Sequence, residues 1–128
     1  MNKEFVNYEQ ALALKELGFN EFCFAYYKDI KGEKVLLDDS MNFDGECDAP
    51  LYQQAFRWLI EEYSVYGIIH ITNISKEQGI DCEVEICGLP DENGLSRLFK
   101  LDGIFKYQEA QDACLNKLIE IVKDGKHV

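Results

Sequence analysis

The alternation of apolar and polar residues divides the chain into three helix-like and five strand-like segments. Apolar side chains at helical spacing predict helices over residues 8–17, 48–64 and 107–123. Alternating or β-branched runs predict strands over residues 21–28, 34–37, 68–73, 80–87 and 97–101. The predicted order is therefore α-β-β-α-β-β-β-α. Short, hairpin-like connections favour an α+β fold, with about five strands in an antiparallel or mixed sheet and the helices on one face.

The ends of the first helix are well marked. Asn7 is an N-cap residue, and Gln10 three positions later completes a capping box. Gly18 supplies the left-handed position that follows a helix, and Phe19 comes next, as in a Schellman motif. These residues predict a helix that is defined by its own sequence.

Two of the predicted strands differ in their surroundings. The strand 80–87 alternates, with Ile80, Cys82, Val84 and Ile86 facing inward and Asp81, Glu83 and Glu85 facing water. The strand 68–73 is a run of β-branched residues without this alternation, and we expect it to be buried. His70 would then be a hydrogen-bonded residue of the core.

The second predicted helix has more apolar surface than one core needs. Its main face consists of Tyr52, Ala55, Phe56, Leu59 and Tyr63. At 100° per residue, Leu51 and Trp58 lie together a quarter turn or more away from this face. Such a second stripe should cover another element of the chain, a second subunit or a ligand, and packing within the chain and an interface are both open.

Aromatic residues gather near the first hairpin and the second helix, beyond what core packing requires. Together with the second stripe, they give the candidate partner- or ligand-binding residues Leu51, Arg57, Trp58, Tyr27 and Tyr66. The surplus apolar surface favours a homo-oligomer. A non-enzymatic binding protein is the first hypothesis for the function.

Length and composition indicate a folded globular protein. The chain has 128 residues, of which 47% are hydrophobic and 29% charged, and we expect one domain over residues 1–128. No apolar run reaches the 18 or more residues that a membrane helix needs, and the N-terminus does not resemble a signal peptide. We therefore expect a cytoplasmic protein that does not bind membranes.

The net charge of −11 changes the range of partners. An acidic chain is repelled by phosphate backbones, so we expect no direct binding of nucleic acid. An alternative hypothesis is that the carboxylates imitate phosphates and occupy the basic groove of a DNA- or RNA-binding protein. The candidate acidic surface would combine the row Asp81, Glu83 and Glu85 with the loop 38–48.

No motif for catalysis, metal binding or cofactor binding rises above background. The five cysteines contain no CxxC pair, and we expect reduced thiols, with Cys82 and Cys114 on apolar faces. The loop 38–48 fails the EF-hand pattern. A small thiol or hydrolytic enzyme, built around His70 and a cysteine, is a further alternative. We predict no catalytic residue, metal or cofactor.

Three stretches of the sequence look familiar together. They are Ala11–Asn20 running into Phe22–Tyr27, then Ala49–Trp58, and finally Tyr107–Ala110 with Ala113–Val122. In these stretches, about a third of the chain, the sequence resembles a group of small uncharacterised proteins of Bacteroidetes and their phages or prophages. Residues 65–101 depart most from the group.

The resemblance implies an accessory binding protein in the cytoplasm of an infected host cell. Such proteins block host defence by occupying a host protein or by sequestering a small nucleotide signal. The group has no assigned activity, so the resemblance implies no catalytic residues.

Overall fold

The computed structural model describes residues 4–37, 47–90 and 96–126. It divides the chain into two compact units, Met1–Ala55 and Phe56–Val128, and helix α2 (Tyr52–Tyr63) crosses the boundary between them. The predicted α+β class is confirmed, with three helices and seven strands in the described residues. The strands form two antiparallel sheets instead of the single sheet expected. The expectation of one domain stays a prediction.

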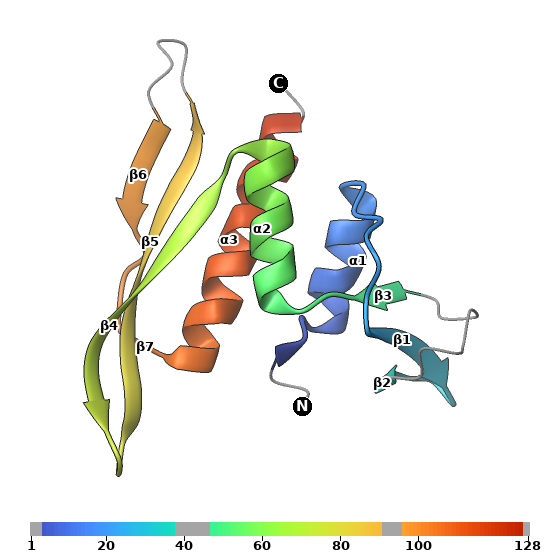
Figure 1. Cartoon of the computed structure of the whole chain (residues 1–128), viewed down its shortest axis with the longest axis horizontal. Helices are drawn as coiled ribbons and strands as arrows, with labels where there is room; N and C mark the ends of the chain where they lie inside the picture. The colour runs from blue at the N-terminus through green and yellow to red at the C-terminus, as the bar shows by residue number, and fades with distance from the viewer. Residues whose placement is uncertain (1–3, 38–46, 91–95, 127–128) are drawn as a thin grey trace. The chain divides into compact units, whose positions relative to one another are not determined.

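The first unit contains helix α1 and a three-stranded sheet (Figure 1). The sheet order is β2-β1-β3, and both pairs of neighbouring strands are antiparallel. A tight turn joins β1 to β2, where the Asp29 carboxylate accepts a hydrogen bond of 2.8 Å from the Gly32 N–H. The bounds of these elements are α1 Tyr8–Glu16, β1 Ala25–Ile30, β2 Glu33–Leu37 and β3 Cys47–Ala49.

The strand β3 explains two differences from the predicted bounds. Residues 47–49 pair with residues 25–27 of β1, so Asp48 and Ala49 are extended and the second helix begins only at Tyr52. The predicted strand 21–28 begins at Ala25, because residues 21–24 pair with no strand in the described part of the chain. The backbone there is held instead by the Gln54 side chain, which donates a hydrogen bond of 2.7 Å to the Phe22 carbonyl.

Helix α1 has the ends that the sequence predicts. The Asn7 side chain accepts a hydrogen bond of 2.8 Å from the Gln10 N–H, and the Gln10 side chain accepts one of 3.0 Å from the Asn7 N–H. At the other end, Gly18 has φ +106° and the Phe19 N–H donates to the Leu14 carbonyl at 3.0 Å. The capping box and the Schellman motif are both confirmed.

A small core holds the first unit together. Phe5, Ala25 and Ala49 are buried, and the half-buried side chains Tyr27, Leu36 and Leu51 pack against them. The Tyr27 hydroxyl donates a hydrogen bond of 2.7 Å to the Val6 carbonyl, and its ring meets Tyr8 edge to face. Tyr27 therefore contributes both apolar area and a polar bond to this unit.

The second unit contains the rest of α2, a four-stranded sheet and helix α3 (Figure 1). The strand β5 lies in the middle of this sheet, with β4 along one side and β6 and then β7 along the other. Helix α3 covers one face, where Cys82, Val84 and Ile86 of β5 are fully buried. The bounds are β4 Tyr66–Ser75, β5 Gly79–Pro90, β6 Ser96–Lys100, β7 Phe105–Lys106 and α3 Tyr107–Lys126.

Helix α3 begins at Tyr107, as predicted, and ends at Lys126, three residues later than predicted. The helix continues through Gly125, although glycine is a residue type that commonly follows the end of a helix. At its start, Lys106 has no side chain suited to an N-cap, but the Glu109 carboxylate accepts a hydrogen bond of 3.1 Å from the Lys106 N–H. This reversed contact is half of a capping box and satisfies one backbone donor at the helix start.

The closest approach between α3 and the sheet is at Gly67 of β4. A Cβ atom built on Gly67 would overlap the Cys114 sulfur of α3, while its next neighbours lie at ordinary contact distances, 3.4 Å for the Ile86 methyl and 3.5 Å for the Glu85 carbonyl. Cys114 is 1% exposed. The helix can rest on the first part of β4 only because residue 67 has no side chain.

Replacing Gly67 by alanine should therefore lower the free energy of unfolding by about 1–3 kcal/mol, the usual cost of overpacking a core. Urea unfolding followed by circular dichroism measures this change. In a chain that also carries Cys114→Ala, the same substitution should cost less than about 1 kcal/mol, since the obstructing sulfur is gone. Equal costs in the two backgrounds would show that the sulfur is not the obstacle.

Candidate functional site

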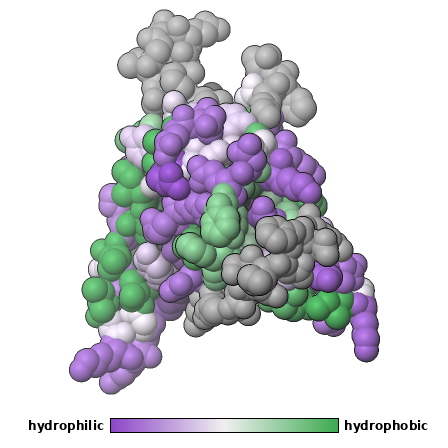
Figure 2. Space-filling view, turned by 45° about the vertical axis from the view of Figure 1, so that its right-hand side comes forward, coloured by the Kyte–Doolittle hydropathy of each residue, from purple (hydrophilic) through white to green (hydrophobic). Residues whose placement is uncertain are grey.

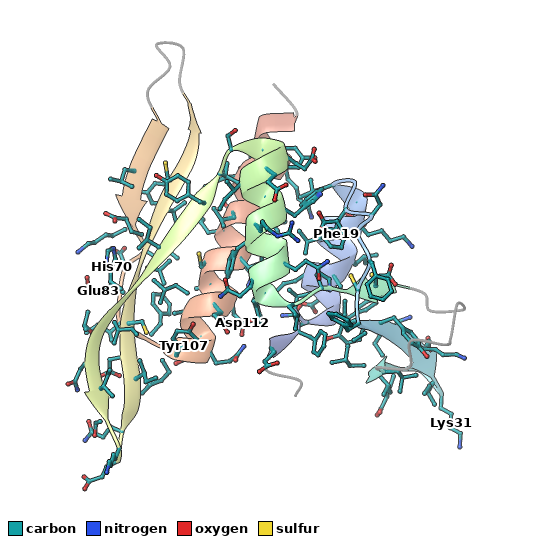
Figure 3. The ribbon with its side chains drawn as sticks, in the orientation of Figure 1. Phe19, Lys31, His70, Glu83, Tyr107 and Asp112 are labelled. Carbon is teal, nitrogen blue, oxygen red and sulfur yellow. The ribbon has the colours of Figure 1, made fainter. Side chains whose placement is uncertain are left out.

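The four-stranded sheet has an outer face, the face turned away from α3. Because Cys82, Val84 and Ile86 face the helix, the alternate residues of β5 and their partners on the neighbouring strands face outward. Figure 3 shows His70 and Glu83 on this side of the sheet, and the two residues are direct cross-strand partners. The predicted alternation of the strand 80–87 is confirmed.

Each carboxylate in the row Asp81, Glu83 and Glu85 has a basic side chain as its partner. The Lys106 ammonium lies 2.6 Å from Asp81, the Lys100 ammonium lies 3.0 Å from Glu83, and the His70 Nε2 atom lies 3.1 Å from Glu85. The hydrogen bond from Lys106 holds the pKa of Asp81 below its usual value, and the bond to Glu83 raises the pKa of Lys100. The charges of Asp81 and Glu83 are therefore compensated by ammonium groups, and Glu85 has the His70 imidazole as its partner.

The strand β4 lies at one edge of the sheet, and its side away from β5 is exposed. No strand pairs with this side in the part of the chain that the structure describes, so its backbone N–H and C=O groups are open to another strand. Seven of its ten residues are exposed and none is buried. The sequence-based expectation of a buried strand was wrong, and so was the core position of His70, whose side chain is 47% exposed. We call this side of residues 66–75 the β4 edge.

The β4 edge differs from every other described strand in charge. Each of the other six strands contains at least one Asp, Glu, Lys or Arg, whereas β4, with the sequence YGIIHITNIS, contains none. The opposite side of the same sheet carries Lys100 and Lys106, the residue type that commonly protects edge strands. One protective feature is present in β4, a register irregularity between Ile71 and Asn73.

Exposed isoleucines accompany the uncharged edge. The β4–β5 hairpin runs beyond the start of α3 (Figure 1), and there Ile71 and Ile74 are 52% and 71% exposed on the helix side of the sheet. Figure 2 shows hydrophobic residues over the hairpin at the lower left, with hydrophilic residues at its end. Side chains of this size raise the tendency of an edge to pair with another chain.

The five candidate residues from the sequence are divided between the two units. Leu51 and Tyr27 come together, packed against the core of the first unit, and Tyr27 gives its hydroxyl to the Val6 carbonyl. Leu51 forms a bridge with Phe5 and precedes α2, so the helical spacing that placed it beside Trp58 does not apply. These two residues belong to the first unit, and the other three belong to the second.

Trp58, Arg57 and Tyr66 have different surroundings. Trp58 is only 5% exposed and meets Tyr63 edge to face, with ring centroids 5.5 Å apart. Arg57 is on the exposed side of α2, 3.3 Å from Glu61. Tyr66 is 40% exposed at the start of β4, and a hydrogen bond with the Cys87 thiol is the largest cause of its raised pKa. Tyr66 alone of the five belongs to the β4 edge.

The remaining residues of the β4 edge were missed by sequence reasoning, although a signal was present. Ten consecutive residues without a charge are unusual in a chain that is 29% charged. The pattern was interpreted as burial, since buried strands and unprotected edge strands share it.

Within the described part of the second unit, no thiol lies beside His70. In the β4–β5 register, Cys87 is four residues from Glu83, the partner of His70, which is about 13 Å along a strand. Cys82 faces α3, on the other side of the sheet. Among the described residues no three His, Cys, Asp or Glu side chains form a group that could hold a metal ion. Nor does any described helix combine the length and apolar character needed to cross a membrane.

Burial makes the core thiols poor nucleophiles. It raises the pKa of Cys114 from 9.0 to about 12 and also raises that of Cys82. Because the folded chain holds the Cys114 proton at a higher pH than the unfolded chain, this contribution to stability is complete below pH 9 and is lost as the pH rises from 9 toward 12.

We expect iodoacetamide at pH 8 to leave Cys114 and Cys82 unmodified in the folded protein and to alkylate both in urea. Mass spectrometry of peptides from the two samples measures the difference. Alkylation of Cys114 at the same rate in both samples would show that the core around α3 is open in solution.

Comparisons with known proteins do not assign the chain to a family. No protein-family model, curated protein or solved structure matches it. The resemblance to phage and prophage proteins stays a prediction.

Proposed function

We propose that this chain is a non-enzymatic binding protein that binds a protein partner by adding one of the partner's strands to the β4 edge. The observation that supports it most is the combination in β4 of an unpaired side, exposure along its length and absence of charge. Strand addition takes its affinity from main-chain hydrogen bonds and its selectivity from alternate side-chain contacts. The edge offers both, through its open backbone and its exposed isoleucines.

The rest of the sheet suits such a role. The strand β4 is joined to β5 by a long antiparallel ladder, and β5 is fixed to α3 by three fully buried side chains. A partner strand would therefore meet a rigid edge and lose little free energy in ordering it. The row of paired polar side chains beside the edge would set which partner residues fit on the outer face.

The alternatives from the sequence have less support. Imitation of nucleic acid needs uncompensated carboxylates, and those of the outer face are paired with Lys106, Lys100 and His70. Most of the acidic loop of that hypothesis, residues 38–46, lies outside the described residues. On the outer face, sequestering of an anionic nucleotide would require Lys106 and Lys100 to give up their carboxylates. An accessory role in phage infection stays a prediction from the resemblance.

A library of random peptides tests the proposal. We expect the immobilised chain, at low surface density, to select peptides that bind in an extended form. The amide protons of residues 66–75 should then exchange more slowly in the complex, because they become hydrogen-bonded. Hydrogen–deuterium exchange measured by mass spectrometry reports this protection.

Two variants of equal charge make the test specific. Ile74→Lys places a charge on the β4 edge and should weaken peptide binding about tenfold or more, whereas Ile104→Lys, at a residue 67% exposed between β6 and β7, should leave it unchanged. Peptides that protect other residues, or that bind both variants equally, would contradict strand addition at β4.

A further inference from the structure

The geometry points to a second copy of this chain as a partner of the β4 edge: we propose that two copies associate through antiparallel pairing of β4 with β4. This inference rests on the proposed function, since it names a partner for the same surface. It does not use Leu51 or Trp58, the residues from which the sequence suggested an oligomer.

Charge is the first argument. Each copy carries a net charge of −11, so most pairs of surfaces from two copies repel each other. The strand β4 contains no Asp, Glu, Lys or Arg, and of its two titratable side chains, Tyr66 and His70, His70 already faces Glu85 at 3.1 Å. Asp81 and Glu83 of the neighbouring strand β5 are paired with Lys106 and Lys100. The β4 edge is therefore where two acidic copies can approach without bringing like charges together.

Symmetry is the second argument. A strand that pairs antiparallel with its own copy is related to it by a two-fold axis, so the same surface serves on both sides. Every strand pair in the described residues is already antiparallel, so the new pair would extend the second sheet with the geometry it has. A foreign strand would need a matching pattern of side chains, whereas a second copy of β4 supplies an uncharged strand of equal length.

The exposed isoleucines are the third argument. Ile71 and Ile74 lie on the helix side of the sheet, where the hairpin runs beyond α3. In the two-fold pair, both helices lie on the same side of the joined sheet, so the isoleucines of the two copies come onto one continuous face. Each copy then covers part of the exposed apolar surface of the other copy.

The size of this interface sets the expected strength. One strand from each copy and two exposed isoleucines bury much less than the roughly 1,600 Å² of a standard stable interface. We therefore expect a reversible dimer with a dissociation constant in the micromolar range. The irregularity between Ile71 and Asn73 shortens the stretch of regular pairing and acts in the same direction.

Sedimentation equilibrium of the whole chain over a concentration series tests the inference. We expect a monomer–dimer equilibrium in the wild type, an increase of about tenfold or more in the dissociation constant for Ile74→Lys, and no change for Ile104→Lys. Both positions are exposed, 71% and 67%, and both variants have the same net charge, so they differ only in which side of the sheet they alter. Circular dichroism confirms that each variant is folded.

Hydrogen exchange locates the contact. The amides of residues 66–75 should become more protected as the concentration of the wild type rises, and those of β6 should not. A wild type that stays monomeric over the series, or a dimer weakened equally by the two variants, would overturn self-association through β4. If such a monomer still binds peptides along β4, the proposed function stands, and if peptide binding is also absent, both proposals fail.

Discussion

The packing of α3 against β5 is the contact on which the second unit depends. Cys82, Val84 and Ile86 are wholly buried there, and Gly67 lets the helix come close to the first part of β4. A helix is about 10 Å wide with its side chains, and neighbouring strands are about 4.8 Å apart. One helix centred on the middle strand therefore reaches its neighbours along the stretch of sheet that it covers. The far part of β4 has no cover within its own unit, because the β4–β5 hairpin runs beyond the start of α3.

The features that could be predicted from the sequence are those that neighbouring residues determine. The ends of α1 depend on Asn7, Gln10 and Gly18, which act within one turn of the chain. The alternation along β5 depends on which residues meet the helix and which meet water, and a pattern with a period of two records this directly. Both were confirmed in detail. The pairing of residues that lie far apart in the sequence was harder to predict, as β3 shows. Its residues suit the start of a helix but form a strand, because residues 25–27 lie beside them.

The β4 edge shows why the candidate site was harder to foresee. Buried strands and exposed edge strands that pair with another chain contain the same kinds of residues, namely apolar and β-branched side chains without charge. A sequence pattern therefore cannot separate the two. His70 was placed in the core for this reason, although it is half exposed beside Glu85. For Trp58 the sequence leaves packing within the chain and an interface both open, and in the structure its side chain is buried. The second apolar stripe that suggested an interface combined Trp58 with Leu51, and Leu51 is not part of the helix.

The junction at Lys106 has a mechanical consequence. This residue ends β7, its backbone N–H bonds to Glu109 at the start of α3, and its ammonium group bonds to Asp81 and to the Gln78 carbonyl. Strand and helix therefore meet without a hinge. A rotation of α3 would have to break the pairing of residues 105–106 with residues 81–82, so the helix and sheet must move as one body. Force applied along β4, as when a bound strand is pulled, would pass through β5 into the helix instead of being absorbed by a flexible connection.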